Sequence, residues 1–329
     1  MRLLILLLTM ACGSSTPAAP TEPTTTAPPE APIAASEENT CQPDLGELQE
    51  WQHSTRARLT LRMGSAHHST QGPVVIEGSP VVLTGKFAYG NVSKDLEGEK
   101  VQVFIREGEC AWTRSVEGET DSDGRLRLEL PAMPVGLYDY LLVVAGDHSM
   151  TRGVVAVLSP EAPVVVFDID GTLTVSDGEV FQEALLGSTP EIFEGAGEVV
   201  RHYASAGVQP LYITGRTYHF QGPTIEWLDG QGLAHGPLHT TDSVRDAFPG
   251  SNVEEYKQAF LEHIRGLGLR IVAAYGNASS DVCAYARAGV PPEQTWIVGE
   301  NGGTACEGSG ATHALSSYTE HLGELRAPN

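Results

Sequence analysis

Hydrophobic and polar positions follow two different patterns along the chain, and the change falls near residue 160. Residues 100–105 and 125–130 alternate apolar and polar side chains, and turn residues such as 121–124 separate these short stretches. Several short alternating strands at this spacing are typical of antiparallel β-sandwiches. We therefore predict an all-β sandwich domain over residues 41–159.

From residue 160 onward, apolar runs alternate with helical patterns. Residues 164–167 are Val-Val-Val-Phe, which indicates a strand buried on both faces. Further strands are expected at 209–213, 270–275 and 295–298, and helices at about 191–206, 224–230, 253–265, 281–287 and 313–326. Alternating strands and helices predict a parallel α/β sheet. We predict this second domain over residues 160–329.

The first 40 residues indicate a targeting signal and a linker rather than a folded domain. Residues 3–10 form an apolar run after Arg2, and residues 8–12, Leu-Thr-Met-Ala-Cys, resemble the lipobox of bacterial lipoproteins, with Cys12 as the lipidated residue. A plain cleaved signal peptide is the alternative. Residues 13–40 are rich in Pro, Thr and Ala and predict a disordered linker. We therefore expect an exported protein, anchored by lipid in the bacterial cell envelope, in the periplasm or on the outer surface.

Charge and cysteine content limit the partners further. The formal net charge is −22, which argues against nucleic acid because phosphate binding needs a basic face. The four remaining cysteines allow three complete pairings. Proximity in sequence favours the disulfides Cys41–Cys110 and Cys283–Cys306.

Two carboxylates follow the buried strand at once. Asp168 and Asp170 stand one residue apart, and Gly171 ends the strand. Ligands bind at the carboxyl ends of strands in open α/β sheets. Two close carboxylates repel each other unless a cation or a shared proton relieves them. The pair therefore predicts a Mg²⁺ site with a nucleophile, although Asp and Gly are also ordinary turn residues.

Polar residues mark other strand ends and helix starts of this domain. They are Thr214 after strand 209–213, Lys257 near a helix start, and Asn277 with Asp281 after strand 270–275. Each one taken alone has a plain structural reading, as a turn residue or a solvated charge. Their order along the chain and their positions at strand ends and helix starts indicate a functional site.

Together these residues resemble the four motifs of the haloacid dehalogenase-like (HAD) phosphohydrolases. Residues 168–174, Asp-Ile-Asp-Gly-Thr-Leu-Thr, match the first motif. The resemblance implies an α/β HAD-like Rossmannoid parallel sheet. The spacings between the motif residues leave no room for a separate cap domain. The preceding sandwich pattern is typical of the immunoglobulin-like type.

The resemblance also implies a catalytic cycle. Asp168 attacks phosphorus and forms an aspartyl-phosphate, and Asp170 protonates the leaving group and then activates water. Thr214, with the backbone near Gly215, and Lys257 hold the phosphoryl group.

The same resemblance implies the remaining site residues. Arg216 either contacts the substrate phosphate or is a surface residue of its loop. Mg²⁺ is held by Asp168 and Asp170 together with Asn277 and Asp281.

A narrower resemblance is to the LNS2 domain. It rests on the 168–174 motif, on residues 273–285, Ala-Ala-Tyr-Gly-Asn followed by Asp-Val-Cys-Ala-Tyr, and on residues 289–298. LNS2 domains occur in lipins, which are Mg²⁺-dependent phosphatidate phosphatases, and in membrane-associated phosphatidylinositol transfer proteins of the RdgB type. The latter typically lack the nucleophile and bind phosphatidate without hydrolysing it.

This chain keeps both aspartates, so we expect a Mg²⁺-dependent phosphatidate phosphatase at a membrane surface. The alternatives are a non-catalytic phospholipid-binding module and a phosphatase of soluble phosphomonoesters or phosphoproteins. Phospholipid is thus the expected partner, and the partner of the β-sandwich stays open.

Overall fold

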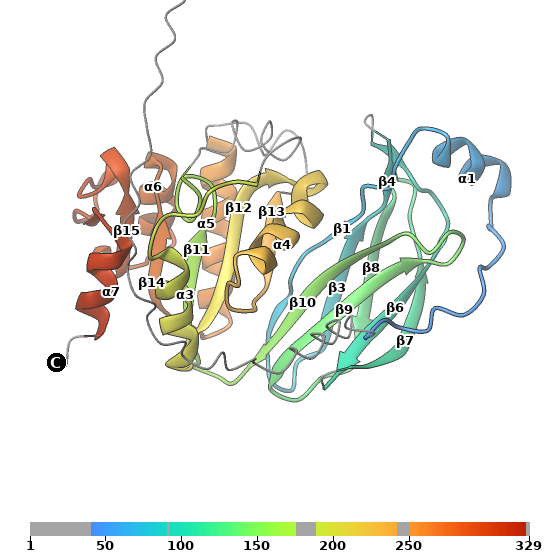
Figure 1. The fold of residues 1–329 in the computed structure, drawn as a ribbon, viewed down its shortest axis with the longest axis horizontal. Coiled ribbons are helices and arrows are strands. Elements are labelled where there is room, and N and C mark those ends of the chain that lie inside the picture. The colour runs from blue at the N-terminus through green and yellow to red at the C-terminus, as the bar shows by residue number, and fades with distance from the viewer. Residues whose placement is uncertain (1–40, 91–92, 109, 176–188, 242–250, 327–329) are drawn as a thin grey trace, which may run out of the picture. The chain divides into compact units, whose positions relative to one another are not determined.

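The computed structural model describes residues 41–90, 93–108, 110–175, 189–241 and 251–326 (Figure 1). The predicted leader with Cys12 and the predicted linker at 13–40 lie outside these residues. So do residues 176–188 and 242–250, which fall between the predicted motifs, so the expectation of a capless site stays a prediction.

The first half of the described chain is a β-sandwich. It begins with helix α1 (Ser54–Leu61) and continues with strands β1 (Ser69–Thr70), β2 (Val74–Ile76), β3 (Val81–Lys86), β4 (Ala88–Tyr89), β5 (Lys94–Asp95), β6 (Lys100–Glu107), β7 (Ala111–Glu119), β8 (Arg125–Leu130), β9 (Gly136–Val144) and β10 (Met150–Leu158). One sheet has the order β1-β3-β8 and the other β2-β10-β9-β6-β7, with β4 and β5 as a separate pair. Except for the parallel pair β2 and β10, neighbouring strands of the sandwich are antiparallel.

The alternation in sequence explains the sandwich core. In β8, Leu126 and Leu130 are buried, whereas Arg125 and Arg127, on either side of Leu126 in the sequence, are exposed. Successive strand side chains point to opposite faces, so one face of each sheet turns inward. The apolar side chains of both sheets meet in one cluster. The prediction of a β-sandwich is confirmed, and the structure joins Cys41 to Cys110 by a disulfide.

The second half is a parallel α/β domain. Its elements are β11 (Pro163–Asp168), α3 (Ala196–Ser205), β12 (Gln209–Thr217), η1 (Tyr218–Phe220), α4 (Gln221–Gly230), β13 (Leu238–Thr241), α5 (Ser251–Gly266), β14 (Arg270–Gly276), α6 (Ser279–Arg287), η2 (Pro292–Gln294), β15 (Thr295–Val298), η3 (Gly299–Asn301), β16 (His313–Leu315) and α7 (Tyr318–Arg326). The six strands have the order β13-β12-β11-β14-β15-β16, and every neighbouring pair is parallel. The prediction of a parallel α/β sheet is confirmed.

Helices cover both faces of this sheet, which buries β11 on both sides. Val164 and Val166 pack in a cluster with residues of α5 and α6. Val165 and Phe167 pack in a second cluster with residues of α3, α4 and α7. Because β11 is buried on both faces, its sequence is an unbroken apolar run rather than an alternating one.

The helix expected at about 313–326 is wrong in its first part. Residues His313–Leu315 form strand β16, which pairs in parallel with β15, and helix α7 begins only at Tyr318. Strand β13 was not expected either. Both strands lie at the edges of the sheet and have three or four residues, too few to show a period-two pattern.

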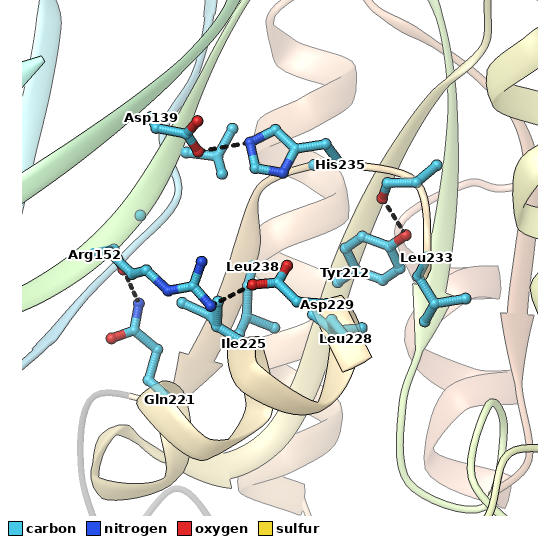
Figure 2. Close-up of a pocket in the computed structure, with 14 residues that line it drawn as sticks. Asp139, Arg152, Tyr212, Gln221, Ile225, Leu228, Asp229, Leu233, His235 and Leu238 are labelled. Atoms are coloured by element: carbon cyan, nitrogen blue, oxygen red, sulfur yellow. Dashed lines mark hydrogen bonds and ion pairs between the residues drawn. The ribbon is translucent and has the colours of Figure 1, made fainter. Parts of the chain in front are cut away.

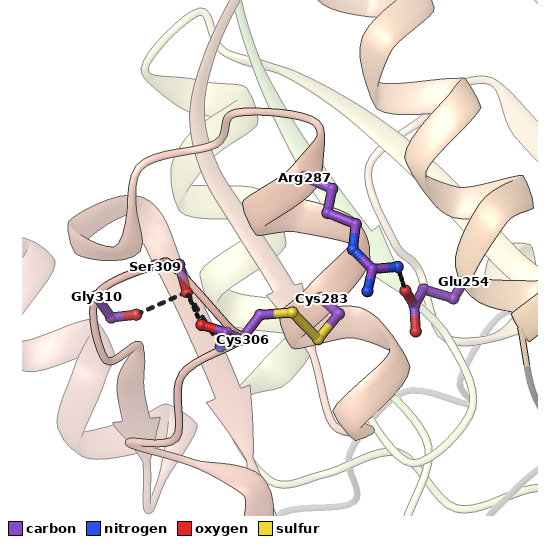
Figure 3. Close-up of a disulfide and its surroundings, with 6 residues drawn as sticks. All are labelled: Glu254, Cys283, Arg287, Cys306, Ser309 and Gly310. Atoms are coloured by element: carbon purple, nitrogen blue, oxygen red, sulfur yellow. Dashed lines mark hydrogen bonds and ion pairs between the residues drawn. A yellow bond between two sulfur atoms is a disulfide. The ribbon is translucent and has the colours of Figure 1, made fainter.

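The disulfide Cys283–Cys306 ties α6 to the loop before β16 (Figure 3). Arg287, also on α6, pairs with Glu254 of α5. These two links join α6 to the loop before β16 and to α5.

Hydrogen bonds and apolar contacts join the sandwich to the α/β domain. Gln221, buried at the start of α4, accepts from the Thr70 backbone N–H and donates to the Thr70 carbonyl. Around the pocket in Figure 2, Asp139 pairs with His235 at 2.7 Å and Arg152 pairs with Asp229. The domain boundary at 159/160 stays a prediction, since β2 and β10 share a core cluster with the α/β strands.

Candidate active site

The two leading carboxylates lie at the carboxyl end of β11, where the sequence places them. Asp168 is the last residue of β11 and lies in register with Ile213 of β12, so Thr214 follows at the same edge. Gly171 has φ +67°, a conformation that glycine adopts without strain, and it turns the chain out of the strand. The parallel register thus brings Asp168 and Thr214 together although 46 residues separate them in sequence.

Asp168 is buried and bound on both of its oxygens. Its side chain is 2% exposed, Oδ1 accepts from Lys257 Nζ at 2.7 Å, and Oδ2 accepts from Thr172 Oγ1 at 2.9 Å. Lys257, on α5, also donates to Asp281 Oδ1 at 2.5 Å. One ammonium therefore links two carboxylates that come from different strand ends.

Burial and charge act against each other in this group. Burial raises the pKa of Asp168 to about 7; Lys257 opposes the rise, while Asp281 and Asp170 add to it. Burial alone would lower the pKa of Lys257, but the two carboxylates outweigh it and the pKa rises. Lys257 is therefore a fixed cation, able to stabilise negative charge that develops beside Asp168.

Asp170 has a different set of partners. Arg216 binds it through Nε, 3.0 Å from both carboxylate oxygens, and through Nη2, 2.6 Å from Oδ1. Thr214 Oγ1 donates to Asp170 Oδ2 at 2.7 Å. Arg216 is itself 3% exposed and donates to Thr224 Oγ1 on α4 at 2.7 Å. Arg216 therefore binds Asp170 through two of its nitrogens, which fixes the orientation of the carboxylate.

These contacts bear on the roles expected for the last residues of β12. Arg216 does not lie on the surface, because its guanidinium is buried and turned to Asp170 and Thr224, and its contact with a substrate phosphate stays a prediction. The physical reason is that a buried guanidinium needs a carboxylate partner, and Asp170 is at hand. The Thr214 hydroxyl also faces Asp170, and Gly215, whose expected role is through its backbone, lies between Thr214 and Arg216.

The loop after β14 is organised by Asp281. Its Oδ2 accepts from the backbone N–H groups of Asn277 and Ala278, both at 3.0 Å. Gly276 makes room for this carboxylate, since a Cβ there would lie 2.6 Å from the Cβ of Asp281. Asp281 therefore shapes the loop and holds Lys257 at the same time.

Two residues outside the predicted set support the site. Thr172 donates to Asp168, and its Oγ1 lies 3.4 Å from Asn277 Oδ1. Asn301 Nδ2 donates to the Asn277 carbonyl at 2.9 Å. Thr172 stands inside the 168–174 motif and could have been chosen from it, whereas nothing in the sequence marks Asn301.

The predicted Mg²⁺ ligands reach one edge but do not all converge. Asp168 Oδ2 and Asn277 Oδ1 both lie within hydrogen-bond distance of the Thr172 hydroxyl. Asp168 and Asp281 also accept from Lys257, and Asp170 accepts from Arg216. Within the ranges that the structure describes, no group of three or more His, Cys, Asp or Glu side chains is arranged to hold a metal. The oxygen-only donors fit Mg²⁺ in kind, because Mg²⁺ is commonly held by one or two carboxylates and waters.

Comparison with known proteins supplies the family. Residues 66–157 match the model for the beta-sandwich domain of PITM 1-3, and residues 165–299 match the model for its LNS2 domain. The chain therefore has two domains similar to the β-sandwich and LNS2 domains of PITM 1-3. The resemblance to LNS2 domains is thereby confirmed.

The curated relatives are much longer proteins. The chain is 32% identical to membrane-associated phosphatidylinositol transfer protein 1 of Rattus norvegicus over 286 residues, 85% of this chain and 22% of the relative. It is also 32% identical to protein retinal degeneration B of Drosophila melanogaster over 279 residues, 83% of this chain and 21% of the relative. The chain thus spans about a fifth of the length of these relatives.

Solved structures align with half of the chain at low similarity. A putative beta-phosphoglucomutase from Thermotoga maritima covers 50% of the chain at 16% identity with a TM-score of 0.35. The cobalt-bound deoxy-D-mannose-octulosonate 8-phosphate phosphatase from Haemophilus influenzae covers 50% at 15% identity with a TM-score of 0.32. Neither likeness carries an argument about activity.

The predicted location in the bacterial cell envelope is wrong. The relatives are animal proteins, two of them named membrane-associated phosphatidylinositol transfer proteins, and not bacterial envelope lipoproteins. The prediction rested on residues 1–12, and an apolar run of this length followed by cysteine is too short a pattern to specify a compartment. Across the described part of the chain, no helix has both the length and the apolar character needed to span a membrane.

Proposed function

We propose that the α/β domain hydrolyses a phosphomonoester through Asp168, and that the substrate is a lipid phosphate of the phosphatidate type at a membrane surface. The observation that carries the proposal is the buried group of Asp168, Lys257 and Asp281 at the carboxyl edge of the parallel sheet. A buried cation beside a carboxylate suits an anionic nucleophile that must meet an anionic substrate. The names of the relatives, membrane-associated phosphatidylinositol transfer proteins, support a lipid as the substrate.

In this mechanism each side chain at the carboxyl edge of the parallel sheet has its own role. Asp168 attacks phosphorus in its ionised form and becomes an aspartyl-phosphate. Lys257 stays protonated and offsets the charge on the phosphoryl oxygens. Asp281 keeps Lys257 in place. A magnesium ion held by Asp168 and Asn277 would supply further positive charge against the phosphate. Asp170, in its protonated form, gives its proton to the leaving oxygen as the bond from that oxygen to phosphorus breaks. It then takes a proton from the water that attacks the phosphorus of the aspartyl-phosphate, which releases phosphate and restores Asp168.

A second function is favoured by one specific contact. Arg216 and Thr214 engage both oxygens of Asp170, so this carboxylate must leave the guanidinium before it carries a proton. If the contact persists when ligand is bound, the site binds a phosphomonoester without turning it over. Binding without hydrolysis is therefore the alternative function.

Phosphate release distinguishes the two functions. The full chain is incubated with phosphatidate in detergent micelles, or with the soluble substrate para-nitrophenyl phosphate, in Mg²⁺ and in EDTA. We expect release from phosphatidate in Mg²⁺ and loss of release in Asp168→Asn. The matched control Asp44→Asn removes an exposed carboxylate far along the chain and should keep the wild-type rate.

The outcomes separate the candidates. Release from the soluble substrate alone would exclude the lipid assignment, and release that survives Asp168→Asn would exclude the nucleophile. Binding of phosphatidate with no release in Mg²⁺ would establish the binding function instead.

A further inference from the structure

A polar cleft lies on the β-sandwich, and none of the carboxylates of the α/β edge is among its lining residues. Its volume is about 290 Å³, and strands β1, β3 and β8 and the side chain of Tyr218 line it. By comparison, the pocket in Figure 2 has only about 30 Å³, room for a single water-sized group. The sandwich cleft is therefore the larger of these two pockets, with room for a small polar group such as a phosphate.

The cleft is basic although the chain is strongly acidic. Lys86, Arg125 and Arg127 line it, and Asp121 is the carboxylate among its lining residues. Asp121 Oδ1 accepts from the backbone N–H groups of Asp123 and Arg125, so this oxygen serves the turn between β7 and β8. In a chain of net charge −22, this local excess of cations stands out.

Strand register places these cations side by side. Lys86 of β3 lies directly opposite Arg125 of β8, and Thr84 lies opposite Arg127. Arg125 and Arg127 are two residues apart in one strand, so they share a face. Like charges directly opposite each other on antiparallel strands are destabilising. An anion bound in the cleft would relieve this repulsion.

Two of the cations differ in their partners within the protein. Lys86 donates to Asp95 Oδ1 at 2.6 Å, which places one carboxylate beside that lysine. Arg127 is exposed, and within the described ranges it has no ion-pair partner. An arginine fork that is accessible and unpaired is well suited to a phosphate group.

The chain connects this cleft to the proposed catalytic edge. Arg216, which holds Asp170, stands two residues before Tyr218, and the Tyr218 side chain forms one wall of the cleft. Ser93 of the sandwich hydrogen-bonds to the Tyr218 hydroxyl and fixes this wall. The short segment from Arg216 to Tyr218 therefore borders both sites.

We propose that this cleft binds the anionic phosphate group of a phosphomonoester, held by Arg127 with Arg125 and Lys86, next to the catalytic edge. The choice of a phosphomonoester as ligand rests on the proposed function, whereas the cleft and its charge do not. The phosphate can come from a lipid headgroup in a membrane or from a free phosphomonoester. The sandwich would then select substrate or hold the membrane beside the carboxylates.

The test is binding, measured without reference to turnover. The full chain carrying Asp168→Asn is sedimented with phosphatidylcholine vesicles that contain or lack phosphatidate, and it is titrated separately with glycerol 3-phosphate. Arg127→Ala is compared with Arg62→Ala, which removes an exposed arginine outside the cleft. We expect Arg127→Ala to weaken binding about fivefold in the arm that shows binding, and Arg62→Ala to leave it unchanged.

The two arms of the experiment distinguish the sources of the phosphate. If binding depends on Arg127 only with vesicles, the cleft binds a membrane headgroup. If binding of glycerol 3-phosphate depends on Arg127, the cleft binds a free phosphomonoester. Equal binding by the two arginine variants, or no binding in either arm, overturns the proposal. Because Asp168→Asn already removes the nucleophile, loss of phosphate release does not affect this test.

Discussion

The edge of the α/β sheet and the sandwich show two ways of burying an ionisable group. At the edge of the α/β sheet, Asp168, Lys257 and Asp281 are all buried and stay together as an ion-paired group. In the sandwich, His68 is buried, and burial lowers its pKa to about 4, so it is neutral at pH 7. Glu99, also buried there, accepts from the backbone N–H groups of Gln52 and His53. The first arrangement costs desolvation energy that partner charges offset, whereas His68 avoids that cost by staying neutral.

The largest expected effect comes from breaking the ion-paired group. Lys257→Met leaves Asp168 and Asp281 together without a cation, so one of them must take up a proton or remain as an unpaired buried charge. We expect a loss of about 3–5 kcal/mol in the free energy of unfolding, measured by urea denaturation at pH 7. The control Lys94→Met removes an exposed ion pair with Glu97 and should change it by less than about 1 kcal/mol. If Lys257→Met also changed the free energy of unfolding by less than about 1 kcal/mol, the group of Asp168, Lys257 and Asp281 would not be a buried ion-paired group.

Titration of His68 should make the stability of the sandwich depend on pH. Between pH 6.5 and about 4, His68 binds a proton in the unfolded chain but not in the folded one, so its contribution to stability falls as the pH drops through this window. The full shift corresponds to about 3 kcal/mol. Burial also lowers the pKa of His239, on β13 of the α/β domain, to about 4, and this residue contributes in the same direction.

The variant His68→Gln tests this sign. It should flatten the loss of stability between pH 7 and 4, measured as the unfolding midpoint in urea at each pH, while the exposed His53→Gln should leave the slope unchanged. A steeper slope in His68→Gln would show that the sandwich does not hold this imidazole neutral.

An intermediate effect is expected at Asp170. Arg216→Lys keeps the positive charge but loses the fork that binds both carboxylate oxygens and Thr224. We expect a loss of about 1–3 kcal/mol in the free energy of unfolding. Thermal denaturation against wild-type protein measures it, and unchanged stability would indicate that the guanidinium does not stabilise the folded chain through Asp170.

The smallest effect is expected on the basic face of the sandwich. Arg127→Thr places a threonine opposite Thr84 and removes one cation from that face. We expect a gain of about 0.2–0.5 kcal/mol in stability, since Thr pairs across antiparallel strands are favourable and no partner is lost. Urea denaturation of the two proteins side by side measures it, and a clear loss would show that Arg127 supports the fold.

The sequence alone determined the order and the kind of the elements. Strict alternation marked β8, the apolar run marked β11, and the motif beginning at Asp168 marked the functional edge, because local pattern and turn chemistry fix these features. The short edge strands β13 and β16 escaped, since three or four residues carry no period. Residues 1–12 pointed to the wrong compartment, because a short apolar run followed by cysteine does not specify one.

Only the tertiary structure decided which partners the charged side chains take. The sequence placed Asp170 and Arg216 at strand ends but could not show that they bind each other, nor that Lys257 bridges Asp168 and Asp281. Such pairings depend on parallel register across strands far apart in sequence and on the burial that makes an unpaired charge costly. The cations of the β3–β8 face likewise share a cleft only because Lys86 and Arg125 stand opposite each other in the folded sheet.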